Sequence, residues 1–195
     1  MKTNTLPWLS IATLSAVIPL GARLAAGRSG DEALLKALAG SKHSLTEGIQ
    51  QVSKAPETAI SAKFELEDGK LSLSVYTAEK GLGAEADHNV LKEHAGNPEE
   101  AAWKPEAEVF KDVEHVARAS EHLTLAALAP STLADVVKKA EKDQPGTVYS
   151  VTPALRERKA VFVVLVADKG KPVELVYDLL TGSPVKPVNA GAPKK

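Results

Sequence analysis

The chain contains no cysteine, and this absence excludes several kinds of chemistry at once. Disulfide bridges, thiolate nucleophiles, cysteine-ligated zinc and lipidation of an N-terminal cysteine all need a residue that the sequence lacks. Aromatic residues are scarce too, at 4% of the 195 positions. We therefore expect a core of aliphatic side chains that is stable without covalent cross-links.

An excess of charge of one sign is also missing. The formal net charge is −1, from 24 Lys and Arg against 25 Asp and Glu. A nearly neutral chain has neither the basic field typical of nucleic-acid binding nor an acidic block for a cationic partner. The content of hydrophobic residues, 44%, and of charged residues, 25%, is typical of a globular protein.

The first 27 residues predict export. Lys2 precedes an apolar run from Leu6 to Leu20, and small residues at positions 25–27 follow it. This pattern is typical of a cleavable signal peptide over residues 1–27, and the apolar run is short for a membrane span. A retained anchor and an ordinary N-terminal helix are the alternatives. We expect a periplasmic or secreted bacterial protein.

Two segments, 44–98 and 132–184, resemble one another in the same order of features. Each begins with a hydroxyl residue followed three residues later by an acid, the pattern of a helix capping box. These pairs are Ser44 with Glu47 and Thr132 with Asp135. Alternating strand patterns follow, 58–62 beside 147–151 and 70–75 beside 159–164. We predict an α+β fold of two tandem units, each a helix and three antiparallel strands. The units should pack together, because one alone buries little apolar surface.

The other segments connect or flank these units. The N-terminal segment, 28–43, contains a predicted short helix at 31–38. The linker, 99–131, overlaps an irregular polar stretch that runs from residue 97 to Glu108. It is then predicted to be helical over 111–129. Trp103 is interpreted as a plug over the edge of the core, with a ligand contact as the alternative. The tail, 185–195, is rich in Pro, Ala, Gly and Lys and predicts disorder.

The end of the second unit resembles a known family. A strand is followed by Asp178, Thr181 and Gly182 in the order Asp-x-x-Thr-Gly, which is similar to the final turn of PepSY domains. The first unit keeps only the glycine, Gly96. The resemblance implies two tandem PepSY-like copies in an exported, non-enzymatic protein. It also implies a link to propeptides of secreted peptidases and a role in binding or restraining peptidases. The three motif residues predict a structural turn.

Four histidines are the candidates for a metal site, since an acid precedes each of them. They are His88, His94, His115 and His122. The last two lie seven residues apart on a predicted helix, and the first two lie six apart on a predicted strand. These spacings correspond to about 10 Å and about 20 Å, too far for either pair to share an ion unaided. We predict solvated histidines, and a periplasmic metal-binding protein is the alternative function.

No catalytic motif is present in the sequence. It has no nucleophile elbow, no recognisable triad context and no glycine-rich phosphate loop after a strand. The acid pairs, Glu65 with Glu67 and Glu99 with Glu100, are interpreted as solvent-facing charges. We therefore predict no enzyme activity and no cofactor. The leading hypothesis is a peptide- or protein-binding module whose sheet edge engages a secreted peptidase or another envelope protein. A purely structural envelope protein is a further alternative.

Overall fold

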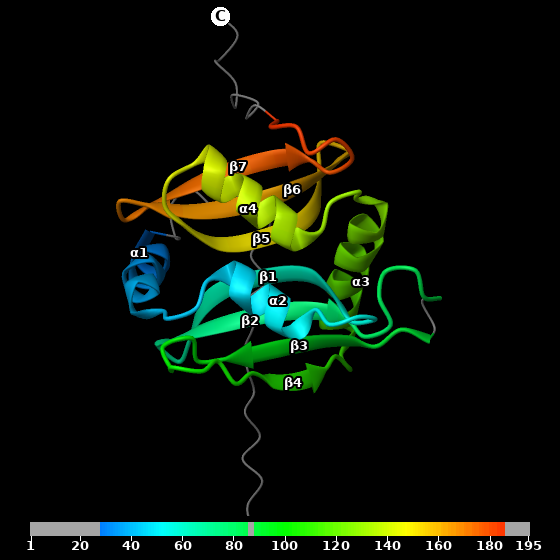
Figure 1. Ribbon diagram of the computed structural model, residues 1–195, viewed down its shortest axis with the longest axis horizontal. Coiled ribbons are helices and arrows are strands. Elements are labelled where there is room, and N and C mark those ends of the chain that lie inside the picture. The colour runs from blue at the N-terminus through cyan, green and yellow to red at the C-terminus, as the bar shows by residue number, and fades with distance from the viewer. Residues whose placement is uncertain (1–27, 86–87, 186–195) are drawn as a thin grey trace, which may run out of the picture.

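The computed structural model describes residues 28–85 and 88–185. Within them the chain forms an α+β fold with four α-helices and one seven-stranded antiparallel sheet, in the order β4-β3-β2-β1-β5-β6-β7 (Figure 1). The strands are β1 (Thr58–Glu67), β2 (Lys70–Ala78), β3 (Leu91–Gly96), β4 (Glu106–Val109), β5 (Thr147–Arg156), β6 (Lys159–Asp168) and β7 (Lys171–Asp178). The helices are α1 (Arg28–Ala37), α2 (Leu45–Val52), α3 (Val113–Leu128) and α4 (Leu133–Asp143), with a 3-10 turn, η1 (Leu38–Gly40), after α1.

Both predicted capping boxes are confirmed. The hydroxyl of Ser44 accepts a hydrogen bond from the backbone N–H of Glu47 at the start of α2, and the Glu47 carboxylate accepts one from the Ser44 backbone. Thr132 and Asp135 make the same reciprocal pair at the start of α4. Each pair satisfies amides that the first turn of a helix leaves unpaired, so the side chains define where these helices begin.

Three hairpins join the strands through two-residue turns. Both turn residues have positive φ in each case, as a type I′ turn requires. The pairs are Asp68 with Gly69, Glu157 with Arg158, and Lys169 with Gly170, with φ between 49° and 77°. The first has the Asp-Gly sequence that is typical of this turn. The second contains no glycine, so the pairing of β5 with β6 must offset the steric cost of its conformation.

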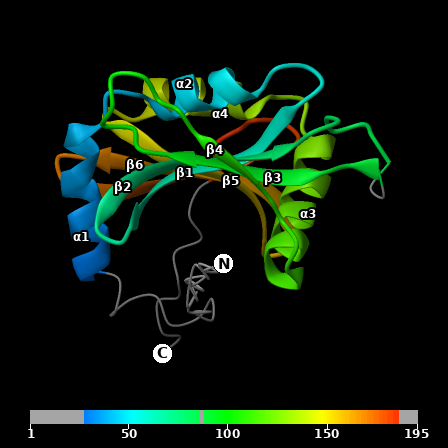
Figure 2. The ribbon, with the colours of Figure 1, turned by 90° about the horizontal axis from the view of Figure 1, so that it is seen from below.

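The helices cover the two faces of the sheet unequally. α2 and α4 lie side by side on one face, and the sheet arches beneath them with α1 and α3 at its two ends (Figure 2). The sheet has two halves, β1–β4 and β5–β7, which meet between β1 and β5. The main apolar core lies between α2, α4 and the strands of both halves, and includes Leu45, Phe64, Val137 and Phe162. A smaller core around Ile60 and Ala119 joins α3 to the sheet.

Several sequence predictions need correction. The polar stretch from residue 97 to Glu108 is not wholly irregular, because β4 begins at Glu106 and pairs with β3. All four β4 residues are exposed, so no hydrophobic pattern indicated a strand. α1 begins before the predicted helix at 31–38, whereas α3 falls within the predicted 111–129.

Trp103 is 2% exposed, as a plug should be. The predicted signal peptide, 1–27, and the predicted tail beyond residue 185 lie outside the described residues.

Candidate functional site

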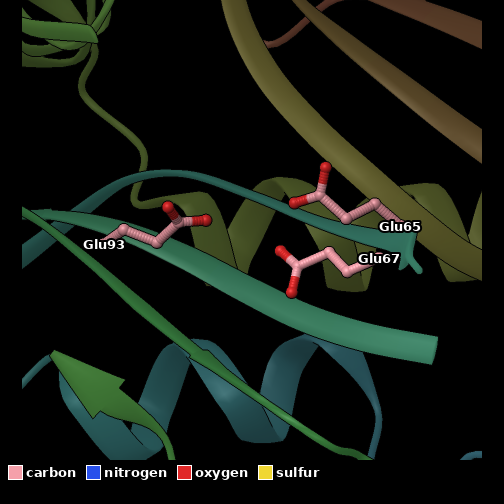
Figure 3. A group of neighbouring side chains, drawn as sticks. All are labelled: Glu65, Glu67 and Glu93. Atoms are coloured by element: carbon pink, nitrogen blue, oxygen red, sulfur yellow. The ribbon is translucent and has the colours of Figure 1, made fainter. Parts of the chain in front are cut away.

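Three glutamates converge on the face of the sheet opposite α2 and α4, which we call the open face. Glu65 and Glu67 lie on β1 and Glu93 on β3, so that β2 runs between them. Their side chains point toward one another (Figure 3), and one carboxylate oxygen from each lies within 4.8 Å of the others. Among the described residues, one group of three or more acidic, histidine or cysteine side chains is close enough to hold one metal ion, and these three glutamates form that group.

Strand register explains why these side chains share a face. Residues paired between antiparallel strands point to the same side, and neighbours along a strand alternate. Leu73 and Val75 of β2 are buried in the main core, so Ser72, Ser74 and Tyr76 face the other way. The open face of β1–β4 therefore carries Lys63, Glu65, Glu67, Ser72, Ser74, Tyr76, Glu93, Ala95, Glu106 and Glu108.

The negative charges of the three carboxylates repel one another. Burial raises the pKa of Glu67, and the neighbouring charges of Glu65 and Glu93 raise it further. Lys63 offsets part of this repulsion, since its Nζ lies 2.5 Å from Glu65 Oε2. Burial, followed by the charges of Glu93 and Glu65, also raises the pKa of Tyr76 well above its usual range. The cluster therefore has an excess of negative charge, with Glu65 and Glu93 half-buried and Glu67 exposed.

A wide groove of about 690 Å³ continues from the glutamates toward β4. Its lining includes five acids and one base, namely Glu67, Asp68, Glu93, Glu106 and Glu108 with Lys70. The sequence contains no acidic run, and its neutral composition argued against an acidic surface. The structure corrects that expectation, because strand pairing brings together acids that are far apart in the chain.

Two of the candidate histidines, His115 and His122, line one pocket under α3. The pocket has a volume of about 190 Å³. Its aromatic wall is a stack in which the ring of Phe110 lies 5.8 Å from Tyr76 and 5.4 Å from His115. His115 Nδ1 lies 2.8 Å from Asp112 Oδ2, so this histidine is engaged at the start of α3. The pocket is thus an aromatic recess whose lining also includes the basic side chains of Lys63 and Arg118.

His122 is held against the sheet instead of facing solvent. Its Nδ1 lies 3.0 Å from the hydroxyl of Ser61, at a bulge in β1. Burial, with smaller contributions from the charges of Arg118 and Lys63, lowers the pKa of His122 to about 4. The ring is therefore neutral at physiological pH.

His94 lies on the opposite face of the sheet from this pocket. It pairs with Val75, a core residue, and its Nε2 lies 2.8 Å from Glu57 Oε1. Thr77 donates a second hydrogen bond, of 2.6 Å, to the same oxygen. Burial opposes the charge on Glu57, but these hydrogen bonds and the nearby cations hold the pKa of Glu57 below its usual range. His94, Glu57 and Thr77 therefore form a structural cluster in which these hydrogen-bonding groups are paired.

The four histidines do not form a common site. His88 lies in the connection before β3, where its Nδ1 is 3.2 Å from Glu85 Oε2, and not on the predicted strand with His94. None of the four belongs to a group of three ligand atoms within reach of one ion in the described part of the chain. Glu67 is exposed, as predicted, whereas Glu65 is half-buried. The sequence pattern did not predict that Glu93 meets Glu65 and Glu67. Their alternation on one strand, with Lys63 on the same face, was the available signal.

The Asp178 turn makes the hydrogen bonds expected of a structural motif. Asp178 Oδ1 accepts hydrogen bonds from the backbone N–H of Leu180, at 3.1 Å, and from the backbone and hydroxyl of Thr181, at 2.9 and 3.0 Å. Gly182 follows with φ of +66°. These backbone hydrogen bonds lower the pKa of Asp178. The motif residues therefore close the end of β7 through hydrogen bonds within the turn.

Comparisons with known proteins give little further guidance. No protein-family model matches the chain, and no curated protein matches it in sequence. A crystal structure described as a putative lipoprotein from Clostridium difficile matches at 13% identity, over 75% of this chain and 92% of that chain, with a TM-score of 0.39. This likeness is too low to transfer a fold or a function. Among the described residues, no helix has the length and apolar character needed to span a membrane.

Proposed function

We propose that the chain is an exported, non-enzymatic binding protein built from two PepSY-like units. In this proposal it binds an extended basic segment of a secreted protein, such as a peptidase, along the free edge of β4. The observation that carries the proposal is an exposed edge strand beside an acidic groove. Edge strands present unpaired backbone groups that a partner strand can bind, and side-chain chemistry then selects the partner.

The matching geometry of the two halves supports the duplication. β1 and β5 are both ten residues long and carry a register shift at equivalent places, after Ala59 and after Val148. Where the two strands meet, Ala62 pairs with Val151, which is its counterpart 89 positions later. A pairing between equivalent residues is what an approximate twofold axis between two copies would produce.

The two edges of the sheet differ in their availability. The edge of β7 is covered by the chain's own segment after the Asp178 turn. The Val185 N–H donates to the Val176 C=O at 2.7 Å, and the Asp178 N–H donates to the Ser183 C=O at 2.8 Å. Beyond β4, the described residues provide no further strand. The β4 edge is therefore the better place for a guest strand.

Charge complementarity indicates what that guest would be. Glu106 and Glu108 face the acidic groove, whereas Ala107 and Val109 point to the other side. Val109 is 41% exposed and offers an apolar contact. A strand added beside β4 alternates in the same way, so we expect basic residues at every second position with small apolar residues between them.

The test uses two synthetic peptides, one alternating lysine with valine and the other alternating glutamate with valine. Fluorescence anisotropy with the full chain should show binding of the lysine peptide, weakened by added salt, and no binding of the glutamate peptide. The double variant Glu106→Gln/Glu108→Gln should lose at least about tenfold in affinity, which corresponds to about 1.4 kcal/mol.

A matched control carries the same charge change elsewhere. Glu121→Gln/Glu141→Gln alters two exposed acids on α3 and α4 and should bind the lysine peptide as the wild type does. Equal binding of both peptides, or equal loss in both double variants, would contradict the edge proposal. Inhibition assays against secreted peptidases then test the class of partner separately.

A further inference from the structure

We propose that Glu65, Glu67 and Glu93 form a binding site for a divalent cation that prefers oxygen ligands, with Ca²⁺ as the best fit. This inference goes beyond peptide binding and uses none of the four histidines. It rests on the convergence of the three carboxylates, on a buried hydroxyl group of the strand that runs between them and on the local charge.

The spacing of the oxygens suits calcium. Ca²⁺ lies 2.3–2.6 Å from its ligands, so two oxygens on one ion can be up to about 5 Å apart. The three carboxylate oxygens lie within 4.8 Å of one another without any movement. Mg²⁺ binds at about 2.1 Å in a strict octahedron, so its ligands must lie closer together and at fixed angles. Ca²⁺ tolerates wide and irregular arrangements of this kind, with water molecules completing its shell.

A second observation comes from Ser74. Ser74 is 0% exposed, and its hydroxyl has no hydrogen-bond partner in the structure. Register places this hydroxyl on the open face, since Ser74 pairs with Lys63 on one side and with Ala95 on the other. It thus lies between the two strands that carry the glutamates. A buried hydroxyl without a partner is costly, and the ion or a water bound to the ion would satisfy it.

The charge of the cluster also favours a bound cation. The three carboxylates gather with oxygens within 4.8 Å of one another, so their charges repel when all three are ionised. The cation seen in contact with the group is Lys63, whose Nζ lies 2.5 Å from Glu65. One ammonium leaves a formal charge of −2 on the cluster when all three acids are ionised. A divalent ion would neutralise that charge and remove the repulsion.

The direct test is calorimetric titration of the full chain with Ca²⁺ and, separately, with Mg²⁺. We expect saturable Ca²⁺ binding in the range of about 10⁻⁵–10⁻³ M and weaker binding of Mg²⁺. Glu67→Gln should weaken Ca²⁺ binding at least tenfold, while the exposed Glu141→Gln should leave it unchanged. Absence of saturable Ca²⁺ binding, or equal affinity in Glu67→Gln and the wild type, would overturn the proposal. Circular dichroism confirms that each variant is folded.

Lys63 allows a sharper variant. If its ammonium competes with a metal ion for the carboxylates, Lys63→Met should raise the Ca²⁺ affinity by about tenfold. If the glutamates and Lys63 form only a structural ion-pair network, the same variant changes stability and gains no affinity. The second result would overturn the proposal.

Terbium luminescence locates the ion. Tb³⁺ replaces Ca²⁺ at oxygen sites and emits when a nearby tyrosine is excited, and Tyr76 is paired with Glu93 on the open face. Emission excited through tyrosine should therefore drop several-fold in Tyr76→Phe, while the Ca²⁺ affinity changes little. Unchanged emission in Tyr76→Phe would place the ion elsewhere and overturn the assignment. Peptide binding measured in the presence of EDTA shows whether the β4 edge works without the ion, so the two proposals can fail independently.

Discussion

At the scale of single residues, His122 differs most from what its position in the sequence implied. It was one of two histidines expected on an exposed helix face. In the structure it lies against Ser61, because α3 packs on the open face through the small residues Ala119 and Ala126. Small side chains let the helix approach the sheet closely, and the imidazole is buried as a result.

This burial gives stability a pH dependence. The pKa of His122 is lowered to about 4 in the folded chain, whereas an exposed histidine in the unfolded chain titrates near 6.5. As the pH falls, the unfolded state therefore binds a proton before the folded state does. The free energy of unfolding should decrease between about pH 6.5 and about pH 4 and level off below, with His122 contributing about 2 kcal/mol by pH 4.5.

Urea unfolding at pH 7 and pH 4.5 measures this contribution by comparing the wild type with His122→Gln. The glutamine can keep a hydrogen bond to Ser61 but does not titrate, so the variant should lose about 2 kcal/mol less on acidification than the wild type. The same loss in both proteins would show that His122 is not the source.

At the scale of elements, the two capped helices were the most predictable. A capping box acts over four residues, so the sequence alone contains both partners. β4 is the opposite case, because its exposed residues have no apolar pattern and it forms only by pairing with β3. Its existence depends on a neighbour that the local sequence does not specify.

The cap of α4 provides a test at this scale. Thr132→Ala removes the acceptor for the Asp135 backbone N–H, and we expect a loss of about 1 kcal/mol in the free energy of unfolding. The adjacent substitution Ser131→Ala is the control, since it removes a hydroxyl outside the capping box and should cost much less. Chemical denaturation of both variants gives the comparison, and equal losses would contradict the role of the cap.

At the scale of the whole molecule, the main core joins both halves. β1 and β5 pair directly only at Ala62 with Val151 and at Lys63 with Ser150. The helices α2 and α4 touch each other above that junction, and one apolar core runs through both halves. The junction is therefore stabilised more by side-chain packing than by backbone pairing.

We expect the two halves to unfold together. Calorimetry should give a single transition, with a van't Hoff enthalpy equal to the calorimetric enthalpy. Val151→Ala, at a residue that is 0% exposed, should lower the free energy of unfolding by about 2 kcal/mol and lower hydrogen-exchange protection in both halves. Val113→Ala makes the same chemical change at a residue that is 85% exposed and should have little effect. Two separate transitions would contradict a shared core.

The candidate site was only partly visible in the sequence. The polar alternation that includes Lys63, Glu65 and Glu67 predicts one exposed face of a strand, and the hairpin turn at Asp68 predicts the neighbour of that strand. Glu93 could not be assigned to the same place, because a long connection separates β2 from β3. Short turns determine register, whereas long connections leave it to packing.

The sequence by itself determined the features that depend on residues close together in the chain. These are the starts of α2 and α4, the Asp-Gly hairpin, the turn at Asp178 and the absence of covalent cross-links. Only the tertiary structure decided the strand order, the added strand β4 and the meeting of Glu65 and Glu67 with Glu93. The physical reason is range: caps and turns are satisfied by local hydrogen bonds, whereas a sheet brings together residues whose pairing depends on the packing of the whole chain.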